Sequence, residues 1–332
     1  MLTFSDLVKR AAELAGSAYY TNGGQGTAEV PIDAHDLDKC KRVVNDGFRM
    51  FIADSPVKGW KWMKRLASVT FDATGEGDDN IDGDPARYYL PAYFNGQIDG
   101  PIHYDGQTGH ATPLEWVDES FIRQRRTPTI ITGYPRYAAI LPHEPATGVL
   151  SATRRWELMV NPNPVKNDTV VFPYTLQFED MQLETGTATS GSATELTDAS
   201  RIEPNGYFVG WVLRIIDGAG RGQSAVVSSF ASGVFTFEDL AVPLDGTSVY
   251  AVEPAGNLHP AGRAFDSAVL DAVKAEVEKQ FENVLGNYLQ YYRQVALPQA
   301  HLLDARSAPR QLGPSRLVPE RVRLNVTYVP RS

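Results

Sequence analysis

A stripe of apolar residues repeats at helical spacing for about thirty positions after Pro260, and it constrains the fold more than any other feature. The stripe consists of Phe265, Val269, Val273, Val277, Phe281, Val284, Leu285, Tyr288 and Tyr292. At a rise of 1.5 Å per residue, one helix of this length would extend ~45 Å, which is long for a compact domain. We therefore predict one long C-terminal helix within residues 254–300, whose stripe packs partly against other copies of the chain.

The helical pattern ends at Pro298, and four later prolines exclude a continuous helix in the remaining sequence. Arginines outnumber acidic residues in this part of the chain. The arginines are Arg306, Arg310, Arg316, Arg321, Arg323 and Arg331, and the acidic residues are Asp304 and Glu320. Because the segment has too few apolar residues for a core of its own, we expect residues 301–332 to form an extended tail.

Two amphipathic helices are predicted at the N-terminus. The first begins after Thr3, where Asp6 completes a capping pattern, and it ends before Gly16. The second runs from near Asp36 to near Ala53, with an apolar face that includes Cys40. Because no base accompanies this cysteine in the local sequence, we interpret it as a core residue rather than a nucleophile.

Short β-like segments bounded by Pro, Gly and Asp follow from Trp60 onward, with one short helix predicted within residues 113–126. The strand candidates are residues 88–91, 100–104, 137–141, 156–160 and 169–178. An aromatic group in this region consists of Trp60, Trp62, Tyr88, Tyr89, Tyr93 and Phe94. It could form an exposed binding platform, but we favour core anchors where the helices meet the sheet, because large aromatic side chains are mostly buried.

The composition changes at residues 185–200, which are almost entirely Gly, Ser, Thr, Ala and acid, and which we interpret as a linker or an exposed loop. Four strands are predicted behind it, at residues 207–216, 223–230, 233–237 and 248–252. Short turns separate them, so they indicate a small antiparallel β module inserted at residues 183–253.

Together these patterns predict an α+β fold, in which two N-terminal helices and one long C-terminal helix pack with a β region. The predicted parts are the first part of a helical and β core at 1–182, the inserted module at 183–253, the helix that completes the core at 254–300 and the tail at 301–332.

Composition narrows the classes of function. The 332 residues carry a formal net charge of −9, which argues against a general nucleic-acid coat. A single cysteine cannot form an intramolecular disulfide, and we find neither an apolar run of ~18 residues nor a secretory signal peptide. We therefore expect a soluble protein made in the cytoplasm.

Two motifs are candidate ligand sites. The run from Asp78 to Gly83 matches the start of a calcium loop, but Tyr89 stands where the twelfth-position glutamate belongs, so we favour an acidic hairpin tip over a weak cation site. The run from Gly218 to Ser224 resembles a phosphate loop, but it lacks the Lys-Ser/Thr pair and a following helix, so we interpret it as a hairpin turn.

No catalytic signature is recognised. The histidines at 35, 103, 110, 143, 259 and 301 are scattered, and neither HExxH nor Gly-x-Ser-x-Gly occurs. A carboxylate pair that could hydrolyse a glycoside remains possible, because the distance between two carboxylates depends on the fold. We predict no catalytic, metal or cofactor residues and no enzymatic activity.

The order of the segments is more informative than any one motif. After the two helices, which end near Asp54-Ser55-Pro56, come a Trp-containing strand, Tyr88-x-Leu90-Pro91-x-x-Phe94, Ile102-His103-Tyr104, Glu119-Ser120-Phe121-Ile122-Arg123, Gly133-Tyr134-Pro135-Arg136-Tyr137-Ala138, Trp156-Glu157-Leu158, Asn161-Pro162-Asn163-Pro164 and Phe172-Pro173-Tyr174. This order resembles the head-to-tail adaptor (neck or connector) proteins of tailed bacteriophages, which are similar in role to the tail tubular A proteins. The resemblance covers residues 1–180 and 263–295.

The resemblance implies a structural protein of the virion neck, assembled in the host cytoplasm as a ring, commonly of twelve copies. The ring would join the portal protein to the next tail component (a nozzle, tail hub or stopper), and genomic DNA would pass through its lumen without specific binding. The portal-docking tail would include Arg306, Arg310, Arg316, Arg321, Arg323 and Tyr328. The subunit-packing residues of the long helix would be Phe281, Leu285, Tyr288 and Tyr292.

Two alternatives stay open. The chain could be a tail or baseplate binding module that uses the inserted β module to bind glycan or another virion protein. A polysaccharide hydrolase that acts through carboxylates is the third hypothesis.

Overall fold

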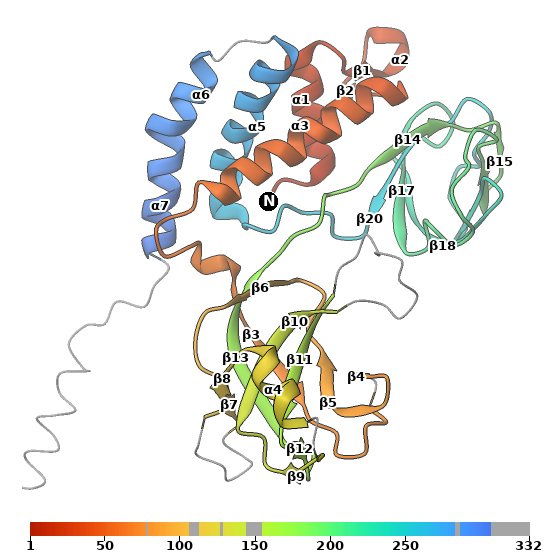
Figure 1. Cartoon of the computed structure of the whole chain (residues 1–332). Coiled ribbons are helices and arrows are strands. Elements are labelled where there is room, and N and C mark those ends of the chain that lie inside the picture. Colours follow the sequence, from red (N-terminus) through yellow and green to blue (C-terminus); the bar gives the residue numbers. More distant parts are fainter. Residues whose placement is uncertain (78, 106–112, 127–128, 144–154, 283–285, 307–332) are drawn as a thin grey trace, which may run out of the picture. The chain divides into compact units, whose positions relative to one another are not determined.

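The computed structural model describes residues 1–77, 79–105, 113–126, 129–143, 155–282 and 286–306 (Figure 1). Helices and several sheets are both present, which confirms the α+β class. Contacts divide the chain into two compact units. Unit 1 contains Met1–Gly59 and the chain from Asp180 onward, and unit 2 contains Trp60–Glu179. The β region is therefore a compact body of its own, whereas the predicted division joined it to the N-terminal helices at 1–182.

The predicted first helix is present as α1 (Phe4–Ala15), and its ends are set by local chemistry. The Thr3 hydroxyl accepts a hydrogen bond from the Asp6 backbone N–H at 3.0 Å, and the Asp6 carboxylate accepts one from the Thr3 N–H at 3.1 Å. This capping box satisfies two amide groups that a helix start leaves unpaired. Gly16 ends the helix in the left-handed conformation, at φ 73°.

The second helix, α3 (Ala34–Ala53), packs along α5 (Asp266–Phe281). A Cβ at Gly47 would lie 2.7 Å from the Cα of Val273, so glycine is required for this close approach. Cys40 is fully buried on α3, as predicted for a core residue, and its thiol lies 3.6 Å from the Ser17 hydroxyl.

The prediction of one long C-terminal helix is wrong, because the stripe is divided between two helices. α5 ends at Phe281, and the next helix begins at Asn287 after Gly286, whose backbone is extended at φ −107° and ψ −151°. The second segment lies beside α5 (Figure 1). Apolar spacing continues in phase across the break, so periodicity alone does not reveal it.

This last helical segment also continues past Pro298, where the pattern was expected to stop. It consists of α6 (Asn287–Tyr291), a π-helical turn (Tyr292–Ala296) and α7 (Leu297–Arg306). The π-helical turn loosens the ladder of hydrogen bonds just before the proline, whose nitrogen cannot donate. Residues 301–306 are therefore helical rather than extended, and the rest of the predicted tail, 307–332, lies outside the described residues.

The β module forms one seven-stranded antiparallel sheet in the order β14-β20-β17-β18-β19-β16-β15. Its strands are β14 (Glu184–Thr187), β15 (Ser190–Gly191), β16 (Glu195–Thr197), β17 (Trp211–Asp217), β18 (Ser224–Ala231), β19 (Val234–Phe237) and β20 (Val249–Pro254). The linker predicted at 185–200 is therefore wrong, since three strands lie within or across it. Its threonines favour extended backbone, and Leu196 and Ala188 reach the module core.

Polar contacts attach this module to the helical part of unit 1. The Tyr19 hydroxyl donates to the Asp217 carboxylate at 2.8 Å, beside the small strands β1 (Tyr19–Tyr20) and β2 (Ala28–Glu29) and the short helix α2 (Thr21–Gly24). Lys41 on α3 donates to Glu184 at 2.8 Å. The contact is therefore built largely from charged and hydroxyl groups.

Unit 2 contains two larger sheets, in the orders β4-β5-β11-β10-β8 and β3-β13-β6. The elements are a 3-10 turn (Lys61–Met63), β3 (Lys64–Thr70), β4 (Asn80–Ile81), β5 (Asp84–Tyr89), β6 (Phe94–Ile98), β7 (His103–Tyr104), β8 (Glu115–Trp116), α4 (Glu119–Arg126), β9 (Thr132–Gly133), β10 (Tyr137–Pro142), β11 (Trp156–Asn161), β12 (Asn163–Pro164) and β13 (Thr169–Leu176). The helix predicted at 113–126 is thus shorter, because its first residues form β8.

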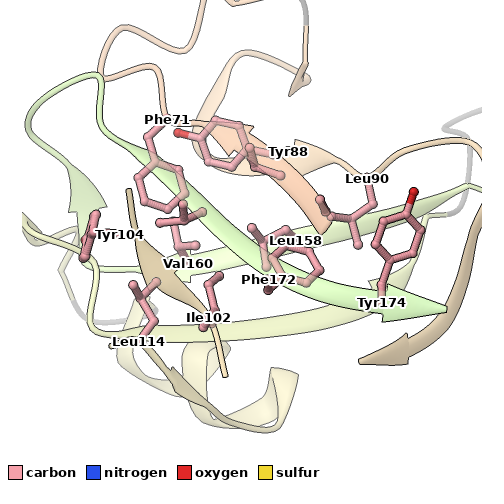
Figure 2. Close-up of a cluster of buried hydrophobic side chains, with 14 of the residues drawn as sticks. Phe71, Tyr88, Leu90, Ile102, Tyr104, Leu114, Leu158, Val160, Phe172 and Tyr174 are labelled. Atoms are coloured by element: carbon pink, nitrogen blue, oxygen red, sulfur yellow. The ribbon is translucent and has the colours of Figure 1, made fainter. Parts of the chain in front are cut away.

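The core of unit 2 lies among these strands, and Figure 2 shows side chains from several of them converging. Tyr88, Leu158 and Phe172 are fully buried there. Of the predicted aromatic anchors, Trp60, Tyr88 and Phe94 are buried, whereas Tyr93 is 55% exposed. Tyr88 and Phe94 therefore serve the core of unit 2, whereas the six aromatics were expected where the helices meet the sheet.

Candidate functional site

The last helical segment, residues 287–306, is held to unit 1 by one buried row of side chains. Tyr292, Ala296, Ala300 and Asp304 are buried at intervals of four residues. The Glu278 carboxylate on α5 accepts a hydrogen bond from the Tyr288 backbone N–H at 3.1 Å. Glu278 thereby caps the segment from a different helix, a role that a local capping motif would otherwise fill.

A polar group at the end of α3 fixes the middle of this segment. The Nε2 atom of His301 lies 2.8 Å from the backbone carbonyl oxygen of Asp54. Burial and the nearby Asp54 carboxylate raise the pKa of the Tyr292 phenol well above its usual value. Tyr292 therefore stays neutral, and it was wrongly predicted to contact a neighbouring copy, since its own chain buries it completely.

The same segment leaves four large apolar side chains exposed. Tyr288 is 39% exposed, Tyr291 52%, Leu302 59% and Leu303 37%. We call these four residues the exposed set. Isolated exposed apolar residues are ordinary, but four on twenty residues of one helix mark a surface suited to contact with another molecule.

The predicted packing and docking residues have different outcomes. Phe281 is half-buried at the end of α5, Tyr288 belongs to the exposed set, and Leu285 lies outside the described residues. Arg306 is exposed at the end of α7. The remaining docking residues, Arg310, Arg316, Arg321, Arg323 and Tyr328, lie outside the described residues. Burial therefore contradicts the predicted packing role of Tyr292, whereas the roles of Phe281, Leu285 and Tyr288 stay predictions.

Unit 2 contains a buried ionic cluster that sequence reasoning missed. The Glu157 carboxylate is fully buried and accepts two hydrogen bonds from Arg87, at 3.1 and 2.7 Å. His143 places Nδ1 2.9 Å from Glu157 and Nε2 3.4 Å from the Tyr89 hydroxyl. The hydrogen bonds that Arg87 donates to Glu157 raise the pKa of Arg87. Since both histidine nitrogens face residues of this cluster, its geometry is that of a structural clamp.

A hollow of 890 Å³ lies in unit 1 between the start of α3 and the β module. Its carboxylates surround the largely buried Arg201, which lies 3.6 Å from Asp198, 3.7 Å from Glu184 and 3.0 Å from Glu203. The Tyr250 hydroxyl donates to Asp198 at 2.6 Å, and burial raises the pKa of that tyrosine. The remaining carboxylate of the hollow, Asp38, lies 3.0 Å from Lys41, so each carboxylate has a cation beside it.

Both candidate ligand motifs form turns. Asp82 and Gly83, with φ 55° and 70°, connect β4 to β5, whereas Asp78 lies outside the described residues. The run 218–224 connects β17 to β18, and Gly218, Gly220 and Gly222 have positive φ there. Within the described ranges, no group of three or more His, Cys, Asp or Glu residues is placed to hold a metal ion.

The histidines do not converge on one site. His35 lies on α3, His103 on β7, His143 in unit 2 and His301 on α7, while His110 lies outside the described residues. His259 is fully buried, and its Nε2 atom lies 2.7 Å from Asp266 at the start of α5. Burial lowers the pKa of His259.

No helix in the described part of the chain combines the length and apolar character that crossing a bilayer requires. Comparison with models of known protein families and with characterised proteins finds no match to this chain.

Proposed function

We propose that this protein is a structural head-to-tail adaptor in the neck of a tailed phage virion. Copies of the chain would form a ring that joins the portal protein to the next tail component. Genomic DNA would pass through the lumen of the ring. The proposal rests on the order of the sequence segments and on the C-terminal part of unit 1.

One observation carries the proposal. The last helix exposes Tyr288, Tyr291, Leu302 and Leu303, and it leads directly into the final 26 residues. Those residues carry five arginines and one glutamate, whereas the whole chain carries a net charge of −9. An apolar surface that is followed in the chain by a cationic segment offers two kinds of contact, which suits a subunit that binds both its copies and a different partner.

The acidic balance of the rest of the chain supports the same function. A net charge of −9 per copy would make a ring of copies strongly negative. Such a ring repels the phosphate backbone where its charge faces the lumen, so DNA can move through it without adhering.

Deletion of Pro309–Ser332 tests the portal contact. We expect the shortened chain to keep the melting temperature of the full chain and to bind purified portal rings at least about tenfold more weakly, because the arginines are lost. A matched variant of full length, with Arg310, Arg316, Arg321 and Arg323 changed to glutamine, separates charge from length. Equal affinity of the shortened and full chains for portal rings would exclude tail docking.

The exposed set is tested separately, by imaging rings of the purified protein. Changing Tyr291 and Leu302 to serine should reduce ring formation, since contacts of the exposed set contribute to packing between copies. The control changes Gln290 and Gln294, which are exposed and polar on the same helix, to serine. Unchanged rings in the first variant would remove the exposed set from the interface.

A further inference from the structure

A second hollow, in unit 2, differs from the others in its charge. It has a volume of 540 Å³ and is formed by the second half of α4, the segment from Ile131 to Tyr137 and the end of β11. Its lining residues are Gln124, Arg125, Ile131, Gly133, Tyr134, Arg136, Tyr137, Asn161 and Pro162. Two arginines and no carboxylate are among them. We call it the basic hollow.

Aromatic rings hold one of the two arginines in place. The guanidinium carbon of Arg125 lies 4.3 Å from the ring centre of Phe121 and 4.9 Å from that of Tyr137. The two rings are themselves in edge contact, with centres 5.0 Å apart. This arrangement orders the cation without neutralising it, because a ring face attracts the guanidinium but supplies no counter-charge.

The neighbouring arginines of α4 differ from Arg125, because each of them pairs with a carboxylate. Arg126 donates two hydrogen bonds to Asp84, at 2.8 and 2.7 Å, and Arg123 lies 3.4 Å from Glu119. Within the described residues, neither Arg125 nor Arg136 lies within 4.0 Å of a carboxylate oxygen. Among the residues that the structure describes, no ion pair neutralises the positive charge of the basic hollow.

An exposed group of carboxylates lies around the β4–β5 hairpin of the same unit. Asp84 begins the strand that follows the β4–β5 turn, and its carboxylate accepts the hydrogen bonds from Arg126. The carboxylates near this turn are Glu76, Asp79 and Asp82, all exposed, and we call them the acidic turn. Asp82 lies 3.6 Å from Arg87, whereas no ion pair within the described residues involves the side chain of Glu76 or Asp79. One unit thus presents a basic hollow and a separate group of exposed carboxylates.

We propose that the acidic turn of one copy, through Glu76 and Asp79, occupies the basic hollow of a second copy at Arg125 and Arg136. The contact joins two different surfaces, so repetition generates a ring when the rotation between copies closes. It rests on the proposed ring function and names a contact within it. Charge complementarity of this kind sets the register and partner choice of an interface.

A polyanion fits the basic hollow less well than this acidic turn. Binding to nucleic acid draws its strength from many phosphate contacts, whereas this hollow offers two arginines in a chain whose net charge is −9. Ile131 and Pro162 make part of the wall of the hollow apolar, which suits binding of a peptide segment. Nucleic acid is nevertheless an outcome that the experiment can detect.

Reciprocal charge reversal tests the contact. One variant carries Arg125→Glu and Arg136→Glu, so that its hollow and its turn are both acidic. The other carries Glu76→Arg and Asp79→Arg, so that both surfaces are basic. Self-association of each is measured by sedimentation velocity and by imaging at low ionic strength. We expect each variant alone to need about tenfold or more higher concentration than the wild type to assemble.

An equimolar mixture of the two variants should assemble again, because each hollow then meets a turn of opposite charge. A chain with all four substitutions should also assemble, which shows in addition that the substitutions permit folding. Controls with the same change in net charge are Arg10→Glu with Arg123→Glu, and Glu238→Arg with Asp239→Arg, all at exposed positions. They should assemble like the wild type.

Several outcomes would overturn the contact. They are assembly of either variant at wild-type concentration, a mixture that stays as dissociated as its components, or a wild type that does not self-associate at low ionic strength. Binding of a short DNA duplex that is lost only in the Arg125 and Arg136 variant would assign the hollow to nucleic acid instead. Wild-type affinity of the variants for portal rings, measured in parallel, shows that a failed contact leaves the adaptor proposal intact.

Discussion

The helices of unit 1 meet each other and meet the β module through different chemistry. α3 and α5 approach so closely at Gly47 and Val273 that their backbones nearly touch, and the residues around them are apolar. The β module instead contacts the helices through pairs such as Tyr19–Asp217 and Lys41–Glu184. An added atom cannot be accommodated where two backbones touch, whereas polar pairs that are only partly buried are individually weak. The helical contact should therefore determine the stability of unit 1.

The largest effect is expected from Gly47→Val. Its Cβ would lie 2.7 Å from the Val273 Cα, and a backbone atom cannot rotate away. We expect the free energy of unfolding to fall by about 3 kcal/mol or more, or the protein to be recovered unfolded. Urea unfolding measures the change, with exposed Lys39→Val on the same helix as the control. A loss similar to that of the control would show that α3 and α5 can separate without cost.

A smaller effect is expected from Glu278→Ala. It leaves the Tyr288 N–H without its acceptor and removes the cap of the last helical segment. The expected loss in the free energy of unfolding is about 1–2 kcal/mol, the range of a lost helix cap. The control is Glu282→Ala, at an exposed position just beyond α5. Equal stability of the two variants would mean that burial of Tyr292 alone holds this segment.

Asp217→Ala probes the polar contact and should cost about 1 kcal/mol or less, because its partners are close to solvent. The hydrogen bond from Tyr19 lowers the pKa of Asp217, with further hydrogen bonds from backbone N–H groups. A carboxyl with a lowered pKa in the folded state stabilises the fold above its unfolded pKa, and this contribution is lost as the pH falls through the folded value. Thermal melts of the wild type and the variant should therefore converge at acid pH. A constant difference across pH would refute the electrostatic part of this contact.

The smallest effect concerns His259, which lies where the chain returns from the β module to α5. Burial lowers the pKa of this histidine, so protonation favours the unfolded state. Its stabilising contribution is complete above the unfolded pKa and declines as the pH falls below it. Urea unfolding at pH 7.5 and 5.5 should show a smaller decline for His259→Gln than for the wild type. An identical decline would assign the pH dependence to other groups.

Local signals explain which parts could be predicted from the sequence. The ends of α1 depend on Thr3, Asp6 and Gly16, which are close neighbours in the chain, so the pattern was sufficient. The strand β14 pairs with β20 more than sixty positions later, so the threonine-rich segment resembled a linker until its partner was known. The break at Gly286 was not predicted, because the apolar stripe keeps its phase across it.

The candidate surfaces are harder still to predict from the sequence, because the fold brings their residues together. Tyr292 and Tyr288 fall on the same predicted stripe, yet one is fully buried and the other is 39% exposed, because the segment packs on α5. The basic hollow combines residues near 125, 131–137 and 161, and spacing along the chain does not bring them together. Arginine content alone pointed to the tail and missed this second group of cations.

The pairing of β14 with β20 has a consequence for how such chains diversify. These strands are the first and last of the module and are hydrogen-bonded partners, with Glu184 opposite Val252. Entry and exit are therefore separated by roughly one inter-strand spacing of ~5 Å. Any foreign domain whose termini lie equally close could be exchanged at this point while the flanking helices keep their connection. Recombination could thus change what the protein presents here without redesigning the rest of the chain.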